Sequence, residues 1–192
     1  FNSTKNYFKT EFNKMIIKSF ESGKINLDIN NILLLYGKNE GLKIETINNL
    51  IQNKNNISYY DEKEILDNQN NFLENILSQS LFEKDKIIII KRATDKLVKV
   101  IDEIYTKNLE DTVIIINADN LEKKSKLRSL FEKDKNYVCI AFYADNDRTL
   151  SKIAYNFLKD KNISLSSANI NLITSKCNGD RLALTNELKK LE

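Results

Sequence analysis

Apolar residues gather in five short runs along the chain, and the segments between them place apolar positions at helical spacing. Within the runs, Ile, Leu and Val follow one another with few polar residues between them, as in strands buried on both faces of a parallel sheet. The predicted strands cover residues 31–37, 57–60, 86–90, 112–117 and 137–142.

Amphipathic helices are predicted between these strands. The first helix places Leu42, Ile44, Ile47, Leu50 and Ile51 on one face and ends near residue 53. Further helices are predicted over residues 64–81, 97–105 and 121–131. Repeated strand–helix units of this kind predict an α/β fold, in which flanking helices cover both faces of a five-stranded parallel sheet.

The strand pattern stops after residue 144. Three helices are predicted over about residues 147–160, 166–177 and 180–191, with Ser164 or Ser166 capping the second and Gly179 ending it. We therefore expect an α/β domain over residues 15–144 and a small helical domain over residues 145–192. Met15 is interpreted as a natural start, which makes residues 1–14 an extension.

The composition is that of a soluble globular protein, with 41% hydrophobic and 30% charged residues. The longest apolar run, residues 137–144, is far shorter than the roughly 18 residues that a membrane span requires. The first 18 residues do not have the pattern of a secretory signal. We expect a cytoplasmic protein that does not bind a membrane.

The sequence contains no His, the commonest general base and metal ligand. Ser-His and Cys-His catalytic pairs are therefore excluded, as are zinc sites that include His. Cys139 and Cys177 fit neither a disulfide framework nor a zinc site, and they are interpreted as buried fillers. The net charge is +3, with residues of both signs spread along the whole chain, which indicates no strong nucleic-acid field. We expect no catalytic residue, no metal site and no cofactor.

A glycine turn between Gly37 and Gly41 follows the first predicted strand, where nucleotide-binding proteins hold phosphates. A working phosphate loop has the form G-x-x-x-x-G-K-[ST]. Here the glycines are one residue too close, the Lys-hydroxyl pair is missing after Gly41, and Glu40 would repel an anion. The strand 112–117 also ends in Asn117 instead of a metal-binding Asp. Gly37 and Gly41 are interpreted as a degenerate phosphate-loop turn that only shapes the chain.

A set of segments in a fixed order carries a resemblance to a known family. These segments are LLLYG at 33–37, NEGL at 39–42, SQSLF at 78–82, RATDKL at 92–97, SKLRSLFE at 125–132, GDR at 179–181 and NELKKL at 186–191. Together they resemble the delta subunits of bacterial DNA polymerase III clamp loaders, from about residue 15 to the end.

The resemblance implies an ATPase-like fold that has lost its phosphate loop, followed by a helical lid of three helices. We expect the family's third domain, a C-terminal collar, to be absent from this chain. The implied function is in DNA replication: delta binds the sliding clamp, or beta subunit, and opens it for loading on primed DNA. The other clamp-loader subunits hydrolyse ATP. No catalysis by this chain is expected, although its holoenzyme is a DNA-directed DNA polymerase, a nucleotidyltransferase.

The resemblance also places the clamp contact. In the family, a Leu-Phe pair at the end of the helix before the third strand binds the clamp, and the matching residues here are Leu81 and Phe82, with Ser80 and Gln79 beside them. Two adjacent large apolar side chains at a helix end can fill a preformed pocket. However, SLFEKDK occurs twice, at 80–86 and 129–135, and packing of the Leu in the core also explains both copies. The contact is assigned to the first copy.

Basic residues give a further set of candidates. Lys91, Arg92, Lys124, Lys126 and Arg128 are candidate DNA contacts, although such runs are more often solvated faces.

The lid carries one more candidate arginine. Arg181 lies near the position of an ATP-sensing arginine in active relatives, and we expect it to form an ion pair with a neighbouring carboxylate.

Two other functions remain open from the sequence: an active ATPase of the same fold and a generic DNA-binding module.

Overall fold

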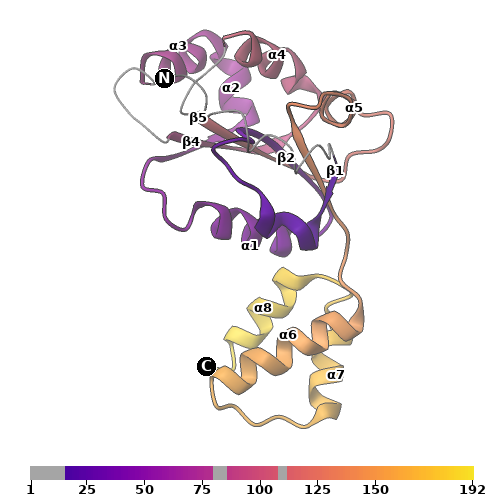
Figure 1. Cartoon of the computed structure of the whole chain (residues 1–192). Helices are drawn as coiled ribbons and strands as arrows, with labels where there is room; N and C mark the ends of the chain where they lie inside the picture. Colours follow the sequence, from indigo (N-terminus) through magenta and orange to yellow (C-terminus); the bar gives the residue numbers. More distant parts are fainter. Residues whose placement is uncertain (1–15, 80–85, 108–111) are drawn as a thin grey trace, which may run out of the picture.

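The computed structural model describes residues 16–79, 86–107 and 112–192, and its centre is a six-stranded parallel sheet (Figure 1). The strands follow the order β1-β6-β2-β5-β4-β3. Their bounds are β1 (Ile16–Lys18), β2 (Ile32–Gly37), β3 (Ile57–Asp61), β4 (Lys86–Ala93), β5 (Thr112–Ala118) and β6 (Val138–Phe142). The α/β class and the five predicted strands are confirmed.

The sixth strand, β1, was not predicted. It pairs in parallel with β6, with Ile17 opposite Ile140. Only Ile17 is buried among its three residues, so β1 has no continuous apolar run. The backbone N–H and C=O groups at the edge of β6 bind β1. Because these backbone groups are the same for every residue type, the sequence of β1 does not show that they are available.

Side chains of the central strands alternate between two hydrophobic cores. In β2, Leu34 and Tyr36 pack into one core, and Leu33 and Leu35 into the other. All six residues of β2 are buried. This two-sided burial explains why the strands are apolar throughout instead of alternating with polar residues.

Helices cover both faces of the sheet (Figure 1). One face carries α1 (Glu40–Ile51) and the 3-10 helix η1 (Ser19–Lys24). The other face carries four helices and a 3-10 turn that contribute to the first core. These elements are α2 (Glu62–Asp67), α3 (Gln69–Gln79), η2 (Asp95–Leu97), α4 (Val98–Thr106) and α5 (Lys126–Lys133).

Two predicted helices differ from the observed ones. The helix expected over residues 64–81 is divided at Asn68, whose backbone is not helical, with φ −146° and ψ 60°. The helix expected from residue 121 begins only at Lys126. It starts there because Ser125 Oγ accepts a hydrogen bond from the backbone N–H of Arg128 at 3.2 Å and caps the first turn.

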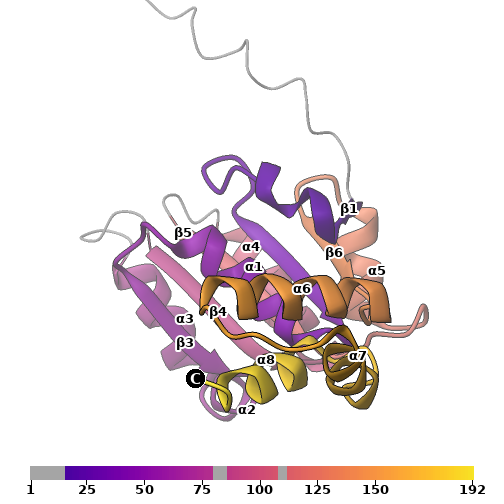
Figure 2. The same cartoon turned by 90° about the horizontal axis from the view of Figure 1, so that it is seen from below.

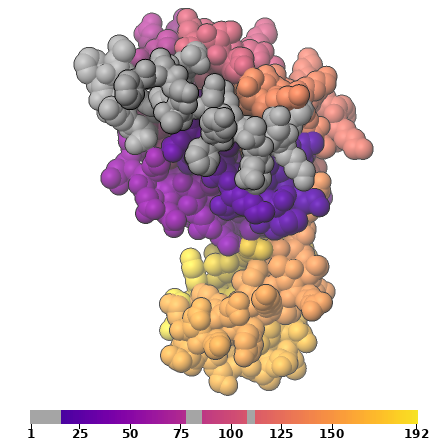
Figure 3. Space-filling model, viewed as in Figure 1, coloured from indigo at the N-terminus to yellow at the C-terminus, as the bar shows by residue number. Residues whose placement is uncertain are grey.

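The remaining helices are α6 (Asp147–Asp160), α7 (Ser167–Lys176) and α8 (Arg181–Lys189), which lie beyond α1 (Figures 1 and 2). They surround their own hydrophobic cluster, with Leu150, Leu184 and Leu188 at its centre. Of the two predicted capping residues, Ser164 and Ser166, it is Ser166 that caps α7. We call α6, α7 and α8 the helical lid. Figure 3 shows that the lid joins the α/β part through a narrower region.

Candidate functional site

The turn after β2 brings the end of that strand against β6. Gly37 has a φ of 130°, and a Cβ at this position would lie 2.1 Å from the carbonyl oxygen of Phe142. Its backbone N–H donates to the carbonyl of Asp119 at 3.2 Å. Gly37 is therefore required for the close approach, which agrees with its interpretation as a turn former.

Gly41 has a different role from the predicted one. It lies in the first turn of α1, and a Cβ there would come within 2.7 Å of the backbone nitrogen of Leu182 in α8. The glycine allows α1 and α8 to pack closely, so it serves the contact with the lid and does not shape the turn.

A charged cluster fills the position where a phosphate loop would hold its ligand. Lys43 is completely buried, and its Nζ donates to the carbonyl of Ala118 at 2.6 Å and pairs with Glu40 Oε2 at 2.7 Å. Glu40 Oε1 accepts a hydrogen bond from Asn117 Nδ2 at 2.9 Å. An internal carboxylate thus neutralises the lysine, and Asn117 ties it to the end of β5. We call Glu40, Lys43 and Asn117 the internal-anion cluster.

The sequence pattern contained a sign of this cluster that the prediction missed. Counted from Gly37, Lys43 is the seventh residue, where G-x-x-x-x-G-K-[ST] has its lysine. Leu42 replaces the second glycine and Ile44 replaces the hydroxyl. Taking Gly41 as the second glycine hides this correspondence. The lysine of the loop is present, and its partner is Glu40.

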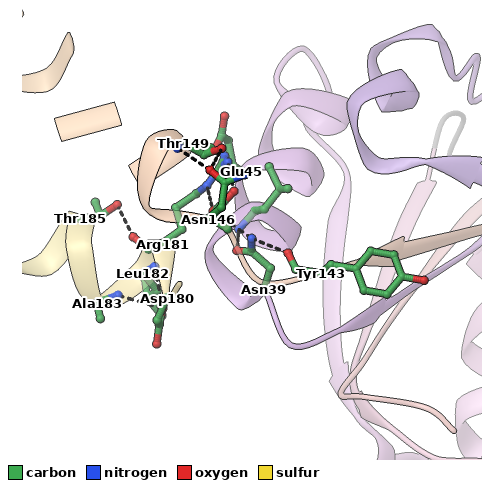
Figure 4. Close-up of polar contacts among 12 residues, drawn as sticks. Asn39, Glu45, Tyr143, Asn146, Thr149, Asp180, Arg181, Leu182, Ala183 and Thr185 are labelled. Carbon is green, nitrogen blue, oxygen red and sulfur yellow. Dashed lines mark hydrogen bonds and ion pairs between the residues drawn. The ribbon is translucent and has the colours of Figure 1, made fainter. Parts of the chain in front are cut away.

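A second polar network joins α1 to the lid (Figure 4). Arg181 binds Asp145 through two hydrogen bonds of 2.8 and 3.0 Å and binds Glu45 at 2.7 Å. Asn39, which caps α1, donates to Asp145 Oδ2 and to the carbonyl of Tyr143, both at 3.0 Å. The expected ion pair of Arg181 is confirmed. We call Asn39, Glu45, Asp145 and Arg181 the lid network.

The guanidinium of Arg181 is held in its charged form. Burial by itself lowers the pKa of Arg181, but the hydrogen bonds to Asp145 and Glu45 outweigh burial and raise the pKa above its ordinary value. Only 13% of its side chain is exposed. The guanidinium of Arg181 is thus largely shielded from solvent and already bound to the carboxylates of Asp145 and Glu45.

The cysteines agree with their interpretation as fillers. Both are buried and free. Burial raises the pKa of the Cys139 thiol to about 12, so the reactive thiolate is scarce at neutral pH.

A pocket of about 420 Å³ lies beside the internal-anion cluster, at the carboxyl ends of β3, β4 and β5. Ile44 and Ile89 supply apolar walls, and Tyr59 and Lys91 line its outer side. The ammonium of Lys91 lies 4.6 Å from the centre of the Tyr59 ring.

The predicted clamp-binding residues fall largely outside the described part of the chain. This applies to Ser80, Leu81 and Phe82, whereas Gln79 is the last residue of α3. In the second copy of the motif, Phe131 is completely buried and its ring stacks on Tyr137 with centroids 4.7 Å apart. Core packing therefore accounts for the second copy.

The candidate DNA contacts separate into two groups. Lys91 and Arg92 lie at the end of β4, where Arg92 forms an ion pair with Asp61. Lys124 and Lys126 are exposed near the start of α5.

Arg128 is the exception among these candidates. Its guanidinium binds Glu132 at 2.7 Å and the carbonyl of Leu121 at 3.2 Å. It faces the protein, so a phosphate would have to displace these bonds. The other four remain predictions.

No group of His, Cys, Asp or Glu suited to a metal ion occurs among the described residues. None of the helices within that same part of the chain is long and apolar enough to cross a membrane.

Comparison with known families decides the identity of the chain. The family model for the DNA polymerase III delta subunit matches residues 33–141, which is more than half of the chain. The chain belongs to the DNA polymerase III delta subunit family. The match covers β2 to β6 and includes both the internal-anion cluster and the glycine turn.

Solved structures show the same fold. The clamp loader delta protein of Bacillus subtilis matches with a TM-score of 0.51 and 17% identity, over 90% of this chain and 56% of that one. The Holliday junction branch migration motor RuvB of Thermotoga maritima matches with a TM-score of 0.56 and 15% identity, over 84% and 54% of the two chains.

Domain III of the replication initiation protein DnaA of Thermotoga maritima is also similar, with a TM-score of 0.55 and 18% identity over 90% of this chain and 79% of that domain. A search of curated proteins finds no match. The delta family member described here thus spans little more than half of the Bacillus protein. At these identities the structural matches show a shared fold, not a shared activity.

Proposed function

We propose that this chain acts in DNA replication as the part of a clamp-loader delta subunit that binds and opens the sliding clamp, without hydrolysing ATP itself. Family membership supports the role in the loader. The proposal that the chain does not hydrolyse ATP rests on Lys43, which is buried and already bound to Glu40 and to the carbonyl of Ala118.

Nucleotide binding would have to undo this arrangement. A phosphate would compete with Glu40 for Lys43, and the Glu40 carboxylate beside it would repel the phosphate. Ile44 offers no hydroxyl for magnesium. Arg181 is occupied by Asp145 and Glu45. The lysine and the hydroxyl of the loop and the arginine of the lid are thus each either replaced or already paired.

A thermal melt tests this part of the proposal. We expect the same melting temperature with and without magnesium ATP, because the chain gains no ligand. A ligand present at 100 times its dissociation constant would stabilise the fold by about 2.7 kcal/mol. Magnesium-dependent stabilisation would instead support the alternative of an active ATPase.

The clamp contact is proposed for Leu81 and Phe82, with Ser80 and Gln79 beside them. The supporting observation is the helix before them: Phe72, Leu73 and Ile76 hold α3 against the sheet. Two large apolar side chains that follow a firmly packed helix are well placed to act as anchors.

A clamp pull-down tests these anchors. We expect the double variant Leu81→Ala/Phe82→Ala to lose most clamp binding, because anchors of this kind contribute about 2 kcal/mol or more each. The matched control is Tyr155→Ala/Leu172→Ala, which removes two exposed apolar side chains from the lid, 59% and 56% exposed. If the Leu81→Ala/Phe82→Ala variant binds the clamp as tightly as the unmodified chain, the assignment of the clamp contact to Leu81 and Phe82 is wrong.

The same proposal places the chain in the cytoplasm with the other clamp-loader subunits, and primed DNA would be reached through the clamp. A generic DNA-binding module is less well supported, because Arg128 faces Glu132 and Arg92 is paired with Asp61. DNA affinity of the isolated chain in the absence of a clamp would favour that alternative.

A further inference from the structure

A shallow groove of about 1010 Å³ lies between the start of α4 and α5. Figure 1 shows these helices on the face of the sheet that is remote from the lid. Five lysines line the groove, namely Lys123, Lys124, Lys126, Lys133 and Lys135. We call this surface the lysine groove.

The charge of the lysine groove is largely uncompensated. Residues 121–135 contain six basic and three acidic residues, so this segment accounts for the whole net charge of +3 of the chain. Among the described residues, Lys124 is the only one of the five lysines with an ion-pair partner, Glu122 at 3.0 Å. Both side chains of that pair are mostly exposed, so it adds little stability.

The other acidic groups nearby form an ion pair or hydrogen bonds with residues other than these lysines. Glu132 binds Arg128, and Asp134 accepts hydrogen bonds from Asn136. Asp95 accepts from Ser125 Oγ and from the backbone N–H of Leu127. Asp134 lines the groove and the charge of Asp95 attracts Lys126, so both offset part of the positive charge. Five lysines against these few carboxylates still leave a positive surplus, which indicates an anionic partner.

The floor of the groove is apolar. Val98 and Leu130 pack against the core with one side and line the groove with the other. A phosphate backbone has no group that would cover these side chains. The described residues that line the groove also include no aromatic ring for stacking with a base and no arginine for a bidentate phosphate contact.

We propose that the lysine groove binds an acidic amphipathic segment of a partner protein. Its carboxylates would meet the five lysines, and an aliphatic or aromatic side chain would cover Val98 and Leu130. This is the mode in which an amphipathic helix lies in a groove, with charge supplying orientation and the apolar contact supplying affinity.

The test is fluorescence anisotropy with the full chain and three labelled probes. The first is a synthetic 14-residue peptide rich in Glu, with Leu at helical spacing. The second has the same charge with every Leu replaced by Ser, and the third is a DNA duplex of 20 base pairs. We expect the first probe to bind at least about tenfold more tightly than the other two, and binding to weaken as salt is raised.

The groove variant is Lys126→Glu/Lys133→Glu, which reverses two charges seven residues apart on α5. The matched control is Lys152→Glu/Lys159→Glu, at the same spacing on α6 of the lid. We expect the groove variant to bind the amphipathic peptide at least about tenfold more weakly and the control to change binding less than about twofold. If the groove variant fails to fold in a circular dichroism melt, Lys123→Ala/Lys135→Ala replaces it, because both lysines lie outside α5.

Two results would overturn the proposal. If the Ser peptide or the duplex binds as tightly as the amphipathic peptide, the surface attracts any polyanion. If the control variant loses as much binding as the groove variant, the peptide binds elsewhere. The clamp pull-down with Leu81→Ala/Phe82→Ala is read separately, so either proposal can fail without the other.

Discussion

At Gly37 the end of β2 lies so close to β6 that no side chain fits. We expect Gly37→Ala to destabilise the fold by about 3 kcal/mol, because its φ of 130° and the contact with Phe142 both exclude a Cβ. Urea denaturation measures the change. The matched control is Gly23→Ala, since a Cβ at Gly23 meets nothing within 4 Å. Equal stability of both variants would contradict the close approach of the two strands.

Asp145 is the centre of the lid network. Its side chain is 9% exposed and accepts hydrogen bonds from both Arg181 and Asn39. We expect Asp145→Ala to cost about 3 kcal/mol of unfolding free energy, because it leaves Arg181 without its main partner. Glu45→Gln is the control, with a cost below about 1 kcal/mol, because the Glu45 side chain is 55% exposed. Urea titrations of both variants check the order, and a larger effect of Glu45→Gln would contradict it.

Single residues differed in how well the sequence predicted them. The ion pair of Arg181 could be expected from its charge and position, but its partners could not be named, because Asp145 and Glu45 lie 36 and 136 residues away. Lys43 was overlooked, although its spacing from Gly37 was visible. Its burial depends on Glu40, and a sequence does not show that two side chains will neutralise each other.

Among the elements, α5 depends on a residue from another helix. Asp95 in η2 accepts hydrogen bonds from Ser125 and from the backbone of Leu127, at the start of α5. The hydrogen bond from Ser125, with further help from Leu127, holds the pKa of Asp95 below its ordinary value. Because the pKa is lower in the folded chain, the contribution to stability is complete above the unfolded pKa and is lost as pH falls through the folded pKa.

This linkage predicts the behaviour of two variants. Asp95→Asn should reduce the stability of the chain at neutral pH, and the difference from the unmodified chain should shrink toward acidic pH. Ser125→Ala should weaken the same pH dependence, because Ser125 supplies the largest part of the shift. Urea denaturation between about pH 3 and pH 7 measures both. A difference that stays constant with pH would show that Asp95 does not contribute through its charge.

The helices show where local pattern is sufficient. The start of α7 was correctly indicated by Ser166, since a capping side chain acts within three residues. The start of α5 was placed five residues too early, because Leu121 continues the apolar spacing but lies before the Ser125 cap. The break at Asn68 was also missed, because no glycine or proline marks its non-helical backbone in the sequence.

At the scale of the whole molecule, we propose that the chain has two domains that meet near residue 144. The sheet has a core on each face, and the lid has a separate and much smaller cluster. The lid helices are 14, 10 and 9 residues long, and isolated helices of this length are marginal in water.

The proposed division can be tested with fragments. We expect residues 145–192 alone to show little helix by circular dichroism, because so small a core rarely supports folding without a partner. We expect residues 15–144 to melt cooperatively, at a lower temperature than the full chain. A cooperative melt of the isolated lid at the temperature of the full chain would show that the lid does not rely on α1.

The sequence by itself determined the α/β fold, the five central strands, the helical end of the chain and the defective phosphate loop. These features depend on interactions between near neighbours or on continuous two-sided burial, so they leave a regular pattern. The tertiary structure alone decided that β1 joins the sheet, that Gly41 allows α1 to pack against α8 of the lid, and that Glu40 forms an ion pair with Lys43. Those outcomes arise where distant segments meet, and the energy of such a contact depends on both partners at once.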